Sequence, residues 1–305
     1  MIACIGGAHV DHHGILRGPL VMGTSNPGRV HTAFGGVARN VAGNLARLGL
    51  KTTLVSRVGD DETGRHVLRH AETLGIDVSL CTVSPERPTA SYTAIVEAAG
   101  ELVLGLADRD IYLELSPALL AAALPVLRVQ QYWFVDTNVP TETISWLLEQ
   151  AGAIPVAIDA ISVVLARGLR ELLARIPLLF ANLAQAASIA GVAQFASAAE
   201  AAAALRSLGA RTGVLTAGAA GIALWDAAGI QSFPALPAQP RDVTGAGDAL
   251  EAATLFGLVS GQALAPSAQL GLAAAAITVE SRDSAAPELT PDLLRQRLTG
   301  RPHAQ

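Results

Sequence analysis

A glycine-rich stretch in the last third of the chain carries the residues best suited to chemistry. It reads Asp242-Val243-Thr244-Gly245-Ala246-Gly247-Asp248 and leads into a largely apolar helical run that begins near Ala249. The backbone N–H groups of Gly245, Ala246 and Gly247 would point out of the helix start, where glycine lets an anion approach closely. The stretch therefore predicts a binding site for phosphate oxygens.

Asp248 places a carboxylate beside that predicted anion site. Two negative groups repel each other, so a carboxylate there needs a task. The natural task is to take the proton from an attacking hydroxyl, as a general base. The alternative is structural: Thr244 caps the helix, and Asp248 complements the helix dipole in the first turn. The stretch taken alone is compatible with both interpretations.

A second pair of glycines opens another predicted helix far upstream. Gly35 and Gly36 precede Asn40, whose side-chain amide can both donate and accept hydrogen bonds. Asp11 follows the first predicted strand and can accept two hydroxyl hydrogens. These groups suit vicinal hydroxyls, whereas the alternatives are a packing turn and a solvated loop aspartate. Two glycine-opened helices in one chain favour the ligand-binding interpretation.

Apolar strand-like runs alternate with helical stretches, which predicts a mostly parallel sheet flanked by helices. The expected strands are 2–5, 54–58, 132–136, 156–159, 178–182 and 213–216. Helices are expected over 40–48 and 61–74, and the glycines that follow them, Gly49 and Gly75, are plausible helix stops. These elements have to position the two glycine-rich turns.

The segment 88–106 differs from this alternation. Two runs rich in Thr, Tyr, Ile, Val and Leu, separated by a turn at 98–101, predict a β-hairpin. A hairpin in an α/β chain has to lie outside the parallel sheet, and the Gly- and Pro-rich stretch 14–36 can pair with it. We interpret the two segments, about 12–34 and 88–110, as a lid.

Composition limits the classes of function. A chain of 305 residues can bury a substantial core, and we expect one domain over 1–305. The uncharged runs 176–199 and 252–279 are Ala-rich and interrupted by Pro and Gly, so they predict buried elements and no membrane span. Two cysteines and a first strand without a secretory leader predict a cytoplasmic location. A net charge of −5 without basic blocks argues against nucleic acid and favours a small-molecule partner.

The chain resembles the ribokinase-like (PfkB) family of kinases over nearly its whole length. The motifs that carry the resemblance, in the family's order, are Gly35-Gly36 with Asn40, Val58-Gly59-Asp60-Asp61-x-x-Gly64, Thr216-x-Gly218-x-x-Gly221 and Asp242 to Asp248. The resemblance implies a three-layer α/β/α core with a mostly parallel sheet and a small β-sheet lid that forms a homodimer contact. It also implies phosphoryl transfer from ATP to a hydroxymethyl group, with Mg²⁺ and a monovalent cation as candidate cofactors.

The resemblance also assigns roles to residues. Asp248 would be the catalytic base, and Gly245, Ala246 and Gly247 would form the anion hole. Asn182, Thr216, Gly218 and Gly221 would border the ATP, and Asp11, Asn26, Gly35, Gly36 and Asn40 would bind the acceptor. Residues 25–28 and 35–40 are similar to the pseudouridine kinase branch, which implies the 5′-hydroxyl of a ribosyl nucleoside as acceptor. A free sugar such as ribose or fructose is the alternative.

One departure from the family pattern concerns the metal. Gln185 stands where the family usually has the Glu of an Asn-x-x-Glu motif, which begins here at Asn182. That glutamate is associated with organising Mg²⁺ and its waters, and a neutral amide would hold them less strongly. If Gln185 does not take part in binding the metal, Asp159 and Asp242 are the first candidates to bind Mg²⁺ in its place.

A second departure is Leu165, near the place where the pseudouridine branch often carries a lysine. Gln185 and Leu165 together raise the alternative of a weakly active, ligand-binding homologue, against which the intact Asp248 argues. A dinucleotide oxidoreductase has little support, because Gly6-Gly7 lacks the full glycine fingerprint that such enzymes carry after their first strand.

Overall fold

The computed structural model describes residues 1–97, 101–281 and 285–300. Its centre is an eight-stranded sheet in the order β14-β13-β12-β11-β10-β9-β1-β4. The strands are β1 (Ile2–Ile5), β4 (Thr52–Val55), β9 (Tyr132–Asp136), β10 (Val156–Asp159), β11 (Leu178–Asn182), β12 (Gly213–Thr216), β13 (Ile222–Asp226) and β14 (Gly229–Phe233). All neighbours from β4 to β12 pair in parallel, and β13 and β14 add an antiparallel edge. The predicted mostly parallel sheet is confirmed.

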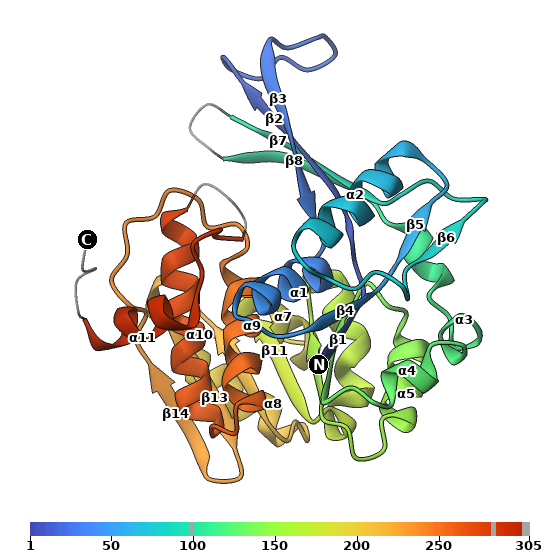
Figure 1. Ribbon diagram of the computed structural model, residues 1–305. Coiled ribbons are helices and arrows are strands. Elements are labelled where there is room, and N and C mark those ends of the chain that lie inside the picture. Colours follow the sequence, from blue (N-terminus) through green and yellow to red (C-terminus); the bar gives the residue numbers. More distant parts are fainter. Residues whose placement is uncertain (98–100, 282–284, 301–305) are drawn as a thin grey trace.

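Helices cover both faces of this sheet (Figure 1). One face carries α1 (Val37–Arg47), α2 (Glu62–Thr73), α9 (Ala246–Val259) and α10 (Leu264–Glu280), with α11 (Pro291–Thr299) against α10. The other carries α3 (Pro117–Ala121), α4 (Leu124–Leu127), α5 (Thr141–Gln150), α6 (Val163–Ala166), α7 (Leu183–Ala190), α8 (Ala198–Ser207) and the 3-10 turns η1 (Asp110–Glu114) and η2 (Arg167–Arg175). A further 3-10 turn, η3 (Gly218–Ala220), follows β12. No helix in the described ranges has the length and apolarity needed to cross a membrane.

The strand sequences explain this layering. In β1 the side chains of Ile2 and Cys4 join the core under α1 and α9, whereas Ala3 and Ile5 join the core on the opposite face. Successive side chains of a strand point to opposite faces, so a strand covered on both sides has to be apolar at every position. This requirement is the physical reason why the central strands were recognisable as continuous apolar runs.

A smaller, four-stranded sheet projects from the body of the molecule (Figure 1). Its order is β3-β2-β7-β8, with β2 (His9–Leu16), β3 (Gly28–Gly35), β7 (Ser91–Val96) and β8 (Leu102–Asp108). The predicted hairpin is confirmed as the antiparallel pair β7–β8. Its partner is β2, which pairs through residues 10–15, so only the first two residues of the stretch 14–36 contact the hairpin, and β3 pairs with β2 instead. Of the turn expected at 98–101, residues 98–100 lie outside the described residues. The role of this sheet as a lid within one domain stays a prediction.

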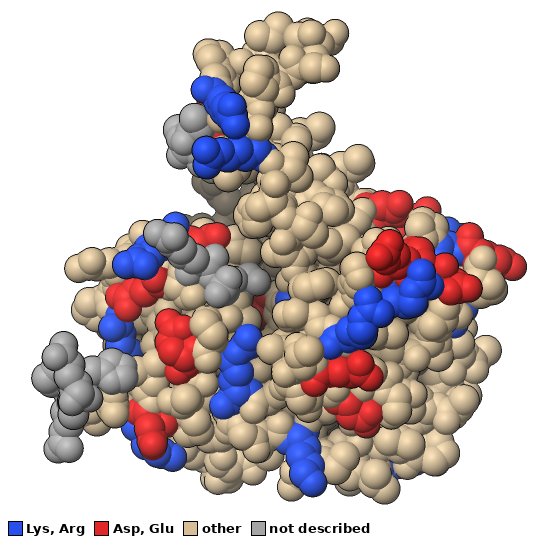
Figure 2. Space-filling view, turned by 45° about the horizontal axis from the view of Figure 1, so that its top comes forward, with Lys and Arg blue, Asp and Glu red and all other residues tan. Residues whose placement is uncertain are grey.

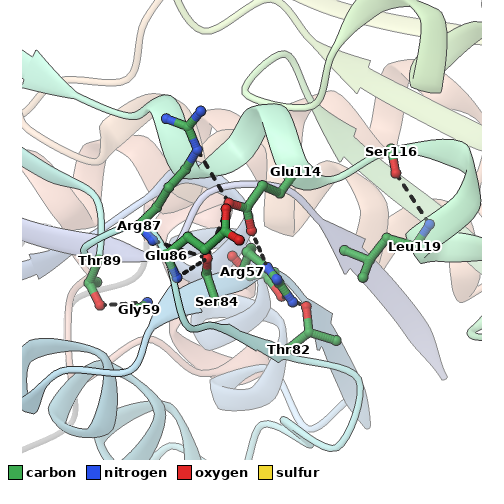
Figure 3. A network of polar contacts seen from close by, with 11 residues as sticks. Arg57, Gly59, Thr82, Ser84, Glu86, Arg87, Thr89, Glu114, Ser116 and Leu119 are labelled. Carbon is green, nitrogen blue, oxygen red and sulfur yellow. Dashed lines mark hydrogen bonds and ion pairs between the residues drawn. The ribbon is translucent and has the colours of Figure 1, made fainter.

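The strand expected over 54–58 is wrong in one respect, because it breaks at Ser56. The Ser56 hydroxyl donates a hydrogen bond to the carbonyl of Gly6 at 2.6 Å, and the chain leaves the large sheet there. It continues as β5 (Arg57–Gly59), which pairs with β6 (Thr82–Ser84). Glu114 anchors this pair, since it accepts hydrogen bonds from Arg57 at 2.8 Å and from Ser84 at 3.1 Å (Figure 3).

The turn from the smaller sheet into α1 depends on Asp136, the last residue of β9. This carboxylate is fully buried and accepts hydrogen bonds from the backbone N–H groups of Gly7 at 2.8 Å, Ala38 at 2.9 Å and Asn138 at 2.9 Å. Burial raises the pKa of Asp136, and the three N–H donors oppose that rise by favouring the ionised form. One side chain thus holds three backbone segments at the carboxyl edge of the sheet.

Gly36 makes this turn possible, because its φ of 96° is in a region that other residues rarely adopt. A Cβ at this position would lie 2.3 Å from the carbonyl oxygen of Gly7. We therefore expect Gly36→Ala to lower the free energy of unfolding by about 3 kcal/mol or more, since backbone strain and overpacking each cost about 1–3 kcal/mol. Denaturant unfolding measures this loss.

Gly49→Ala is the matched control. Gly49 also has a positive φ, of 86°, but a Cβ there would meet no atom within 4 Å. Only the conformational cost of about 1–2 kcal/mol should appear. Equal losses at the two positions would mean that the contact with Gly7 does not constrain the turn.

Candidate active site

The first turn of α9 is open to an anion. The helix begins at Ala246, earlier than expected, and its N-cap is Gly245, with a left-handed φ of 77° and no side-chain cap. The interpretation of Thr244 as the cap is therefore wrong. A Cβ on Gly247 would meet nothing within 4 Å. Because the first N–H groups of a helix have no partner within the helix, this uncapped start can bind phosphate oxygens.

Asp248 lies in the same turn and contacts α1. The side-chain amide of Asn40 donates a hydrogen bond to Asp248 Oδ2 at 2.6 Å, across the packed pair α1 and α9. Burial raises the pKa of Asp248 from 3.8 to about 7, while the Asn40 hydrogen bond and the charge of Arg39 oppose the rise. A carboxylate with a pKa near neutrality is well matched to general-base catalysis.

Arg39 connects Asn40 to the smaller sheet. It is buried, its Nε donates to the Gly35 carbonyl at 3.1 Å, and its guanidinium also donates to the Phe34 carbonyl and to Asn40 Oδ1. Burial lowers the pKa of Arg39 to about 10, and the carboxylates of Asp11 and Asp248 oppose this fall. Because Arg39 occupies the oxygen of the Asn40 amide, the amide nitrogen is the group that faces Asp248.

Predicted acceptor-binding residues line a cavity of about 420 Å³ between the smaller sheet and the large one. We call it the polar cavity, and its lining includes Asp11, Gly36 and Asn40 with His9, Tyr92, Arg109, Asn138 and Leu165. Gly35 lies directly beneath Asp11, since a Cβ at Gly35 would lie 2.1 Å from Asp11 Oδ2. The structure thus brings four predicted residues together at this cavity: three line it, and one supports Asp11.

Tyr112 and His9 orient Asp11, and neither role was predicted from the sequence. Tyr112 Oη accepts a hydrogen bond from the N–H of Ala8 at 2.9 Å and lies 3.1 Å from His9 Nδ1. His9 Nε2 in turn lies 3.2 Å from Asp11 Oδ1. Since the tyrosine proton is free to go to Nδ1, the Nε2–H of His9 donates to Asp11 and fixes one of its oxygens.

Asn26 is not brought to this cavity. It lies in the turn between β2 and β3, where its amide accepts from the N–H of Val21 at 2.8 Å and donates to the Val21 carbonyl at 2.9 Å. The side chain stabilises its own turn at the far end of the smaller sheet. A role for Asn26 in acceptor binding therefore stays a prediction without a contact behind it.

Predicted nucleotide-binding residues line a second cavity of about 520 Å³, here called the apolar cavity. Thr216, Gly218, Gly221 and Gly247 line it together with Leu236, Pro237, Val243, Leu250 and Leu272. Gly218 is open, since a Cβ there would meet nothing within 4 Å, whereas Gly221 packs against the Phe233 carbonyl, only 2.1 Å from where its Cβ would lie. An apolar wall beside an open helix start suits a molecule with a flat base and phosphates.

A third cavity, of about 170 Å³, lies between the other two and is here called the acidic cavity. It shares Thr216 and Gly247 with the apolar cavity, and Val37 and Ile161 with the polar cavity. Its lining also includes Asn182, Gln185, Asp159, Asp248 and Glu251. Ile161 has a positive φ of 41°, a rare conformation for a β-branched residue and one that clusters at functional sites.

Asp159 and Glu251 form a buried carboxyl pair in the acidic cavity. Each of these two carboxyl groups acts on the pKa of the other. Burial is the main cause that raises the pKa of both groups, and the neighbouring carboxylates add to the rise. Sequence patterns gave no sign of Glu251, because it lies one turn after Asp248 in a helix that otherwise reads as apolar.

Comparisons with known proteins agree with this geometry. The model of the pfkB family carbohydrate kinases matches residues 1–291. A pseudouridine kinase of Escherichia coli is 29% identical over 292 residues, which cover 95% of this chain and 93% of that protein. The structure of a carbohydrate kinase from Agrobacterium tumefaciens has a TM-score of 0.84 and 34% identity, covering 98% of this chain and 96% of that one. A ribokinase of Arabidopsis thaliana complexed with ribose and ATP shares the fold, with a TM-score of 0.85 at 20% identity over 97% of this chain and 98% of that one.

Proposed function

The chain belongs to the pfkB family of carbohydrate kinases, and we propose that within this family it phosphorylates the 5′-hydroxyl of a ribosyl nucleoside, with pseudouridine preferred. The observation that carries the proposal is the position of Asp248, at an uncapped helix start and hydrogen-bonded to Asn40, which lines the polar cavity. The 29% identity with a pseudouridine kinase supports the choice of acceptor.

The three cavities divide the two substrates between them. The apolar cavity takes the base of ATP, with Gly218 beside the phosphates, and the N–H groups of Gly245 to Gly247 stabilise the charge on the transferred group. Mg²⁺ neutralises phosphate charge when it is bound, and the carboxyl oxygens of the acidic cavity are of the ligand type that it prefers. Gln185 would contact such an ion only through water.

The acceptor lies in the polar cavity with its hydroxymethyl group toward Asp248. Asp11 accepts hydrogen bonds from ring hydroxyls, and the His9 contact keeps its carboxylate in one orientation. Asn40 binds the acceptor and also orients the base through its 2.6 Å hydrogen bond. Asp248 takes the hydroxyl proton as the new bond between the acceptor oxygen and the γ-phosphorus forms, while the bond from that phosphorus to the bridging oxygen breaks and ADP leaves.

Asp248→Asn tests the base. We expect kcat to fall by about 10² to 10⁴-fold, because the variant lacks the proton acceptor, while ATP binding measured by calorimetry stays intact. In the unchanged protein kcat/KM should fall as the pH drops through about 7, because burial raises the pKa of Asp248 to that value and only the ionised form is a base.

Unfolding curves provide the control for this variant. The raised pKa means that the folded protein loses stability as the pH rises from 3.8 toward about 7. Asn is free of that penalty, so the variant should unfold at a temperature no lower than the unchanged protein at pH 8. A folded Asp248→Asn protein that keeps near-normal turnover would overturn the assignment.

The acceptor is tested by measuring ADP production with Mg-ATP and pseudouridine, common nucleosides, ribose or fructose. Pseudouridine should give the highest kcat/KM, and Asp11→Ala should weaken its binding by about 1–3 kcal/mol through loss of hydroxyl contacts while ATP affinity stays unchanged. If ribose or fructose gives the highest kcat/KM, a free sugar and not a nucleoside is the acceptor. Absence of turnover with every compound would support a ligand-binding homologue instead.

We also propose that two copies pair through the smaller sheet. Its register places Val30, Gly14, Ile95 and Leu104 in one row, on the face opposite Asp11. Val30 is 74% exposed, Leu104 59% and Leu106 65%, and Figure 2 shows the projecting part of the sheet as mostly uncharged. An exposed apolar face of this kind is typical of an interaction surface.

Analytical ultracentrifugation should show a dimer that Leu104→Glu with Leu106→Glu converts to a monomer. Leu113→Glu is the matched control, since Leu113 is 63% exposed but lies in η1, outside the sheet. A monomeric unchanged protein at micromolar concentration contradicts the pairing.

A further inference from the structure

We propose that the protein itself holds a divalent cation between Asp159 and Glu251 before any nucleotide binds. The ion would be of the Mg²⁺ or Mn²⁺ type and would lie in the acidic cavity, beside Asp248. In this chain the charge that attracts the metal would therefore come from α9 and β10 and not from α7. Because the ion binds without nucleotide, its presence can be tested apart from phosphoryl transfer.

Gln185 cannot supply that charge, and its geometry shows why. Its Oε1 accepts a hydrogen bond from the N–H of Asn182 at 2.7 Å, and its own N–H donates to Asn182 Oδ1 at 3.0 Å. This reciprocal capping box begins α7. The only side-chain oxygen of Gln185 thus accepts a backbone hydrogen bond, and the remaining polar group of the side chain is an amide nitrogen, which is a donor and no metal ligand.

Asp242, the other acidic candidate, is also engaged elsewhere. It is exposed and accepts a hydrogen bond from the N–H of Thr244 at 2.8 Å, so its carboxylate shapes the loop before α9. It lines neither the acidic cavity nor the polar cavity. Of Asp159 and Asp242, only Asp159 lines the acidic cavity.

Glu251 is the group that points to a ligand. It is only 7% exposed, lines the acidic cavity, and no N–H or hydroxyl group in the described structure donates to its Oε2. A buried carboxylate oxygen without a donor is costly unless something replaces its lost hydration. Glu251 and Asp248 are three residues apart on α9, so they lie on the same side of the helix.

The electrostatic surroundings favour a cation in the same place. The strongest charged neighbours of Glu251 are Asp159, Asp248 and Asp136, which are all carboxylates. Oxygen ligands from carboxylates are those that Mg²⁺ and Mn²⁺ prefer, and Mg²⁺ is commonly held by one or two of them with several waters. The described residues contain no group of three or more His, Cys, Asp or Glu arranged to hold a metal, so waters would complete the shell.

Electron paramagnetic resonance of free Mn²⁺ measures the binding directly in nucleotide-free protein. The unchanged protein should bind one ion per chain over the millimolar range, and Mg²⁺ should displace it. Outer-shell changes alone alter metal affinity by about 10- to 100-fold, so Glu251→Gln should weaken Mn²⁺ binding by at least about that factor. Asp159→Asn should weaken it to a similar extent and guards against a folding defect in the first variant.

Two further variants decide where the charge comes from. Glu280→Gln is the matched control, because Glu280 is a glutamate on α10 that pairs with Arg297 and does not line the acidic cavity. Its replacement should not change the Mn²⁺ affinity. Gln185→Glu should also leave the affinity within about twofold, since its side chain stays in the capping box. No Mn²⁺ bound by the nucleotide-free protein, or equal affinity in the Glu251→Gln variant, overturns the proposal. A large gain in Mn²⁺ affinity in the Gln185→Glu variant also overturns the proposal, because it would mean that a carboxylate on α7 binds the ion.

Discussion

The arrangement of the site depends on one buried carboxylate, Asp136. Its three backbone hydrogen bonds hold the loop after β1, the start of α1 and the loop after β9 at one point on the edge of the large sheet. The glycines around it are a direct result, because a Cβ on Gly6 would lie 2.2 Å from the carboxyl carbon of Asp136. An ionised group without solvent is stable only when its hydrogen bonds are complete, so this centre tolerates little variation.

The same edge of the sheet gathers four acidic side chains whose ionisation is unfavourable there. Asp136, Asp159, Asp248 and Glu251 are drawn from β9, β10 and α9, and each has its pKa raised by burial. Arg39 is the cation whose charge acts on Asp248, and it is itself fixed by backbone carbonyls. A cluster of this kind lowers the stability of the empty protein and is the expected signature of a site that works with charged ligands.

Local patterns in the sequence were enough to predict the large sheet, the hairpin and the glycine-rich turns. Continuous apolar runs mark strands covered on both faces, and the motif around Asp248 carries its own helix start. Arg39, Tyr112 and Asp136 could not be assigned in this way, because their roles exist only through partners distant in sequence. The break at Ser56 was missed for the same reason, since it depends on a bond to Gly6. The antiparallel edge β13–β14 was also missed, because nothing in the sequence separates such a hairpin from the parallel strands before it.

The acceptor side of the site and the side that handles phosphate come from different parts of the fold. Tyr92, Ala107 and Arg109 come from the smaller sheet and the residue after it, whereas the uncapped helix start and Asp248 belong to α9. Exchanges in β7 and β8 can therefore reshape the acceptor wall without moving the groups that handle phosphate and proton. A scaffold divided in this way is modular in evolution: its choice of acceptor can drift between sugars and nucleosides while its chemistry is inherited unchanged.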